Sequence, residues 1–209
     1  MKLVRLLLAT SASLVALSGL SAMESNSHFG ERYMHHYYQN PQPQDLITAV
    51  NNLDQNGFLN TSSNREQAIG FIAAVFERNP ASVKGWLETS SRVLATRGQR
   101  LMAAAAYFAN KSQGPTVAPT VITSEATLNL QLGEFMATGD HQYIDNIFTA
   151  VASDNSGLST TAKFALAQSA ASDPVFMQVC QTELARQPAS VRETFEAALN
   201  DTTGRKPGA

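Results

Sequence analysis

The sequence predicts an all-α protein in which antiparallel helix hairpins pack as a multi-helix bundle. Apolar residues recur at the helical period of about 3.6 in nearly every segment, and no segment shows the sustained alternation of a strand. Proline and glycine separate these periodic segments. Three segments are apolar nearly all round, as in helices that other helices surround: 68–76, 101–109 and 162–171.

Prolines mark several of the expected helix starts, because the first turn of a helix does not need their missing amide hydrogen. Three of these prolines follow a good N-cap type, and the four pairs are Asn40-Pro41, Asn79-Pro80, Asp173-Pro174 and Gln187-Pro188. Glycines mark ends or joints at Gly57, Gly98 and Gly139. In chain order, the predicted helices cover 28–39, 43–55, 64–78, 81–96, 98–111, 124–138, 141–152, 159–171, 174–186 and 188–200.

Amphipathic helices are expected to cover the apolar ones with one face turned inward. The helix over 43–55 carries such a face in Leu46, Ile47, Val50 and Leu53, and 141–152 carries another in Tyr143, Ile144, Ile147, Phe148 and Val151. Between the helices, TVAPTVIT at 116–123 reads as a long extended crossover because prolines flank and interrupt it.

An irregular α-solenoid is the alternative architecture. Residues 79–88 and 187–196 share Pro-Ala-Ser-Val, a basic residue and a final glutamate at matching places. Prolines 41, 80 and 119 are evenly spaced, but no further member follows and no standard repeat signature fits. The sequence therefore favours the bundle.

Residues 1–22 have the layout of a cleaved secretory signal peptide. Lys2 and Arg5 precede a mostly apolar run that ends in small residues, and the run is too short for a membrane span. About 187 residues remain, enough for one domain with a core. We therefore expect a signal peptide at 1–22, a single all-helical domain at 23–202 and a flexible tail at 203–209. The mature protein is expected in the periplasm or outside the cell.

The charge balance argues against two classes of partner. The signal removes Lys2 and Arg5, which leaves 13 of the 15 basic residues against 17 acidic ones. Nucleic acids and anionic membranes need clustered lysine and arginine, so we expect neither as a partner and no transmembrane span in the mature protein. Cys180 is the single cysteine, which excludes an intrachain disulfide and favours a buried, inert thiol.

Several pieces of the chain resemble an uncharacterised family of exported, all-helical bacterial proteins. The likeness is spread over about residues 33–186 and rests on hydrophobic and turn positions: Tyr37-Tyr38 with Asn40-Pro41, Gly70-Phe71 to Trp86, 135–144, and 161–166 leading to Asp173-Pro174-Val175 and Cys180. The resemblance implies an all-helical fold and contributes no known activity.

The strongest polar cluster lies in residues 28–38. His28, Glu31 and His35 would share one face of a helix and could supply three metal ligands, but Gly30 weakens the helix at that point. The alternative is an aromatic helix that packs Tyr33, Met34 and Tyr37 while its histidines stay in solvent. No second acid-histidine motif completes a site, so we expect no metal and no cofactor.

Standard catalytic motifs are missing from the sequence: no Gly-x-Ser-x-Gly, Ser-x-x-Lys or His-Glu-x-x-His pattern occurs. Glu125 and Glu134 would not share one helical face, so they do not form a carboxylate pair. An enzyme is therefore the less favoured interpretation.

Aromatic residues indicate a different role, in binding. Trp86, the only tryptophan, either packs in the core with Val83 and Leu87 or anchors a partner in a groove, where tryptophan and tyrosine are enriched. If a groove exists, Tyr37, Tyr38 and Trp86 are the residues expected to line it.

The favoured hypothesis is an exported helical protein that acts as a protein-binding or scaffolding module, with an unidentified protein or peptide as its partner. The first alternative is a hydrolase or metal-dependent enzyme with an unrecognised site near residues 28–38. The second is a secreted host-directed factor.

Overall fold

The computed structural model describes residues 28–112 and 121–204. The predicted signal peptide, most of the predicted crossover and tail residues 205–209 lie outside the described residues. Within those ranges the chain is all-α, with ten α-helices, two 3-10 turns and no strand. The elements are α2 (Phe29–His36), η1 (Pro43–Asp45), α3 (Leu46–Gln55), η2 (Phe58–Asn60), α4 (Ser62–Arg78), α5 (Pro80–Val93), α6 (Thr96–Ser112), α7 (Glu125–Thr138), α8 (His141–Val151), α9 (Ser156–Ser172), α10 (Pro174–Leu184) and α11 (Ala189–Thr203).

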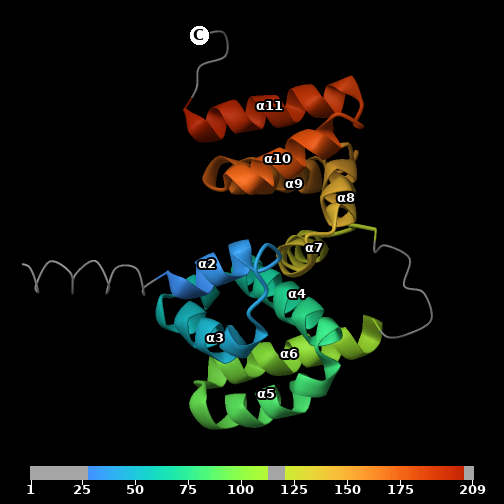
Figure 1. The fold of residues 1–209 in the computed structure, drawn as a ribbon. Coiled ribbons are helices and arrows are strands. Elements are labelled where there is room, and N and C mark those ends of the chain that lie inside the picture. The colour runs from blue at the N-terminus through green and yellow to red at the C-terminus, as the bar shows by residue number, and fades with distance from the viewer. Residues whose placement is uncertain (1–27, 113–120, 205–209) are drawn as a thin grey trace, which may run out of the picture.

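The helices form a multi-helix bundle with α7 at its centre. Figure 1 shows α2 to α6 on one side of α7 and α8 to α11 stacked on the other. Helix α4 packs most extensively on α7, which lies three helices further along the chain. Their buried side chains belong to one hydrophobic cluster that also takes in α11. None of the described helices combines the length and the apolar character needed to cross a membrane.

Local signals place most helix ends where the sequence predicts them. Thr61, Ser124, Asp140, Asn155 and Asp173 each accept a hydrogen bond from a backbone amide of the following first turn. Helices α5 and α10 begin with proline, whereas Pro188 precedes α11 and Pro41 lies before the η1 turn. The left-handed φ of 68° at Gly139 ends α7, as expected of a C-cap glycine.

Two of the three apolar segments are more open than the sequence predicts. Residues 68–76 of α4 are buried on nearly every side. In α6, however, Tyr107 and Phe108 are exposed, and in α9 Phe164 is exposed. Within the described ranges, the neighbouring helices leave these three rings exposed, so the apolar faces of α6 and α9 extend beyond what the described helices cover.

The contact between α4 and α7 is a direct meeting of two backbones. A Cβ atom at Gly70 would overlap the carbonyl oxygen of Leu130, and one at Gly133 would overlap that of Gln67. Because Gly70 faces Leu130 while Gly133 faces Gln67, the two helices run antiparallel. Glycine in mid-helix costs about 1 kcal/mol relative to alanine, so these two positions are justified by the close approach.

We predict that Gly133→Ala lowers the free energy of unfolding by about 1–3 kcal/mol, because the added methyl group forces α4 and α7 apart. Urea denaturation of the mature chain measures this change. Gly85→Ala is the matched control, since Gly85 is exposed in α5 and a Cβ there meets nothing within 4 Å. That variant should gain about 1 kcal/mol from helix propensity alone. A Gly133→Ala protein as stable as the parent would contradict the close-contact argument.

Candidate functional site

The three aromatic residues expected to line a groove are used mainly in packing. Tyr37 is only 3 % exposed and meets Phe71 edge to face, with ring centroids 5.2 Å apart. Tyr38 packs against Phe135 at 5.2 Å, and Trp86 stacks on Phe76 at 5.6 Å. Tyr37 therefore belongs to the core, whereas the half-buried Tyr38 and Trp86 rest against different parts of it. A binding role for the three residues stays a prediction.

The histidine cluster of α2 is divided between a surface pair and a cleft. His28 Nδ1 lies 3.2 Å from Glu31 Oε1 at the start of the helix. His35 is half-buried, and burial lowers its pKa, so its imidazole is uncharged near neutral pH. In the described part of the chain, no three His, Cys, Asp or Glu side chains are grouped so that they could hold a metal ion.

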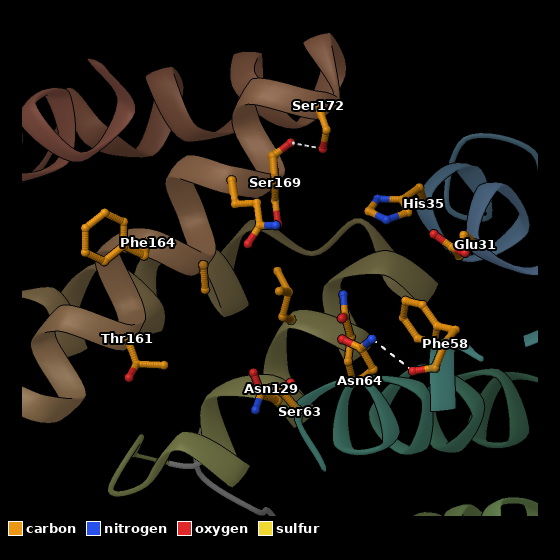
Figure 2. A pocket seen from close by; sticks show the side chains of 14 residues that line it. Glu31, His35, Phe58, Ser63, Asn64, Asn129, Thr161, Phe164, Ser169 and Ser172 are labelled. Atoms are coloured by element: carbon orange, nitrogen blue, oxygen red, sulfur yellow. Dashed lines mark hydrogen bonds between the residues drawn. The ribbon is translucent and has the colours of Figure 1, made fainter. Parts of the chain in front are cut away.

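The most developed candidate site is a polar cleft between the two parts of the bundle. It has a volume of about 510 Å³, within the range of ligand sites. We call it the interhelical cleft, and Figure 2 shows Glu31 and His35 of α2 on one side of it and Ser169 and Ser172 of α9 on the other. Its lining comes from five elements: Glu31 and His35 of α2, Phe58 of η2, Ser63, Asn64 and Gln67 of α4, Asn129 and Leu132 of α7, and Thr161, Phe164, Ala165, Gln168, Ser169 and Ser172 of α9.

Three side-chain amides in this cleft are oriented by partners that can only accept a hydrogen bond. Asn64 Nδ2 donates to the carbonyl oxygen of Phe58 at 2.9 Å, as drawn in Figure 2. Asn129 Nδ2 donates to Glu66 Oε2 at 2.9 Å, and Gln67 Nε2 approaches the thioether sulfur of Met136 at 3.1 Å. A flipped amide would place its oxygen against an acceptor, so the nitrogen positions are fixed. The three amide oxygens accept no hydrogen bond from the described residues, and each NH₂ group keeps a second N–H, so the amides offer acceptors and donors to a ligand.

The hydroxyl groups continue this pattern along α9. Thr161 Oγ1 donates to Glu125 Oε1 at 2.8 Å, and Ser172 Oγ donates to the backbone oxygen of Ser169 at 3.0 Å. Each hydroxyl thereby uses its one proton and keeps lone pairs for an incoming donor. Thr161 and Ser172 therefore offer acceptors to a ligand, whereas the side chains of Gln168 and Ser169, which also line the cleft, can both donate and accept.

Negative charge surrounds the cleft. Glu31 lines it directly, and its Oε1 accepts from Asn56 at 2.9 Å. Glu66 and Glu125 stand behind Asn129 and Thr161. Among the described residues that line the cleft, none is lysine or arginine. The nearby cations are Lys163, whose Nζ lies 5.4 Å from the ring centroid of Phe164, and Arg32, which shares an adjoining hollow with Asp173.

Two aromatic rings add apolar surface to the cleft. Phe58 and Phe164 both line it, and Phe164 is 42 % exposed. The sequence predicts a helix that is apolar nearly all round at 162–171, and the exposure of Phe164 differs from that prediction. The signal that could have identified this face is the polar pair Gln168 and Ser169, one turn further along the same helix.

Elsewhere, Glu134 and Glu125 occupy separate surroundings, as the sequence predicts. Burial and the neighbouring carboxylate of Glu77 raise the pKa of Glu134 to about 7. Burial and the charges of Glu134, Glu77 and Asp140 raise the pKa of Tyr143 to about 12.

By contrast, the buried carboxylate of Glu183 has two partners, His141 Nδ1 at 2.9 Å and Arg186 Nη1 at 3.0 Å. Among these residues, neither Glu134 nor Glu183 lines the interhelical cleft.

We predict that Glu134→Gln flattens the pH dependence of stability. Because the folded-state pKa of Glu134 lies above the ordinary 4.5, the native state binds this proton more tightly than the unfolded chain does. The contribution of the proton to the free energy of unfolding is present at low pH and is lost as the pH rises through about 7. Between pH 5 and 8, the free energy of unfolding of the parent protein should fall by about 2 kcal/mol more than that of the variant, as measured by urea denaturation. Glu196→Gln, which changes an exposed carboxyl of α11, should leave the slope unchanged. Equal slopes in parent and Glu134→Gln would contradict the assignment.

Comparison with known proteins adds no family to this description. No family model matches the chain, and neither the curated proteins nor the solved structures contain a significant match. The resemblance described from the sequence stays an expectation, and functional inference rests on the site itself.

Proposed function

We propose that this chain is an exported binding module that holds a segment of a protein partner in the interhelical cleft. The observation that carries the proposal is the set of amides at Asn64, Gln67 and Asn129, whose nitrogens are bound to the protein and whose oxygens are left to a ligand. Groups held in place before binding lose little conformational entropy when a ligand arrives. The amide side chains that would contact the ligand are therefore already positioned before it binds.

The composition of the cleft supports a peptide-like ligand. Hydrogen-bond acceptors alternate with apolar surface from Phe58, Leu132 and Phe164. A peptide segment offers both backbone N–H donors and side chains that can cover such surface. Glu31 and His35, which the sequence analysis considered as metal ligands, serve in this proposal as part of the wall.

The position of the cleft supports the same function. One wall comes from α2 and α4, the other from α9, and α7 lies between them. Sites where two packed parts of a molecule meet are common places for binding. The predicted signal peptide at 1–22 supports export, and an exported protein would meet its partner in the cell envelope or outside the cell.

A photo-crosslinker in place of Phe164 tests the proposal in the cell that makes the protein. Irradiation should link the full chain to a discrete protein partner, because this ring borders the cleft and is accessible. The same crosslinker at Tyr107, which is 59 % exposed on α6 outside the cleft, is the control and should not give that adduct.

A second substitution makes the test specific. Ala165 lines the cleft and is half-buried, so Ala165→Trp should fill the site and abolish the position-164 adduct. Circular dichroism confirms that the variant is folded. Identical adducts from positions 164 and 107, or an adduct that survives Ala165→Trp in the folded protein, would reject the cleft as the partner site.

A further inference from the structure

We propose that the partner segment places an arginine side chain in the interhelical cleft. This inference rests on the proposed function and specifies the chemistry of its ligand. It is argued from the orientation of the amides, the charge around the cleft and the exposed ring of Phe164.

The hydrogen-bond inventory calls for a ligand rich in donors. The amide oxygens of Asn64, Gln67 and Asn129 are available to the donors of a ligand, because one N–H of each amide is bound to the protein and sets its orientation. The guanidinium group of arginine carries five N–H donors and no acceptor. Arginine is the side chain that best matches this inventory.

The charge distribution favours the same ligand. Glu31 Oε2 accepts no hydrogen bond from the described residues, and Glu31 lines the cleft. Hydrogen bonds between a carboxylate and a guanidinium are about twice as strong as neutral ones. Glu66 and Glu125, behind Asn129 and Thr161, add negative potential without occupying the space. An anionic ligand would face this potential with no lysine or arginine among the lining residues to offset it.

The exposed ring of Phe164 has a cation beside it, on the neighbouring residue of the chain. Lys163 Nζ lies 5.4 Å from its centroid, a cation–π distance. A guanidinium stacks on aromatic rings better than an ammonium does, because it is planar and more weakly hydrated. A bound arginine would compete with Lys163 for this ring, so Lys163→Gln should bind the ligand at least as well as the parent.

The test is a titration of the isotope-labelled mature protein with Nα-acetyl-arginine amide, followed by NMR. The side-chain NH₂ signals of Asn64 and Asn129 report on the cleft directly. They should shift saturably, whereas the citrulline counterpart, which has the same shape without the charge, should bind about 10-fold more weakly. Equal binding of the two probes, or shifts confined to residues outside the cleft, would overturn the proposal.

Glu31→Gln removes the charge but keeps an oxygen for Asn56, so the fold should be retained. Its affinity for the arginine probe should fall about 10-fold. Glu88→Gln, which removes an exposed carboxylate of α5, is the charge-matched control and should leave the affinity unchanged. Equal losses in both variants would show a general charge effect and reject the specific site.

The two proposals fail in distinguishable ways. If the position-164 adduct forms and Ala165→Trp abolishes it, yet the arginine probe neither shifts the cleft signals nor competes with adduct formation, the binding function stands and the arginine inference is overturned. If the probe binds in the cleft but no adduct forms, the inferred chemistry stands and the protein-partner function is rejected.

Discussion

The rest of the structure depends on the close approach of α4 and α7 through Gly70 and Gly133. With no side chain between them, the backbones meet directly, and the positions of Leu130 and Gln67 leave no space for a Cβ. This contact fixes α7 in the middle of the molecule, where it separates α2–α6 from α8–α11 (Figure 1). Each mid-helix glycine costs about 1 kcal/mol, which the packing of two long helices offsets.

The interhelical cleft is a consequence of that arrangement. Because α7 lies between α4 and α9, the wall formed by α2 and α4 faces α9 across a polar gap. Groups next to the cleft orient its three side-chain amides: a carbonyl oxygen orients Asn64, a carboxylate orients Asn129, and a thioether orients Gln67. The fold thus determines which end of each amide a ligand meets.

A buried carboxyl group, Glu183, and a half-buried one, Glu134, have different immediate partners. Glu183 is almost fully buried but is held by His141 and Arg186. Glu134 lies beside Glu77, and burial together with this like charge raises its pKa to about 7. Burial and a neighbouring carboxylate both disfavour the ionised form of Glu134. Both carboxyls lie away from the cleft, so they act on stability and leave binding to other residues.

The all-α class, the ten helices of the described ranges and most of their ends can be predicted from the sequence, because proline, N-cap residues and the helical period act within a few residues of chain. The position of His28, Glu31 and His35 along one short segment is local in the same way. Three features cannot be predicted in this way: the contact of α4 with α7 through two glycines, the burial of Tyr37 and the exposure of Phe164. The cleft is a further example, because its lining residues are as far apart in the chain as Glu31 and Ser172. Helix pairing depends on contacts between such distant residues, and local periodicity carries no information about these contacts.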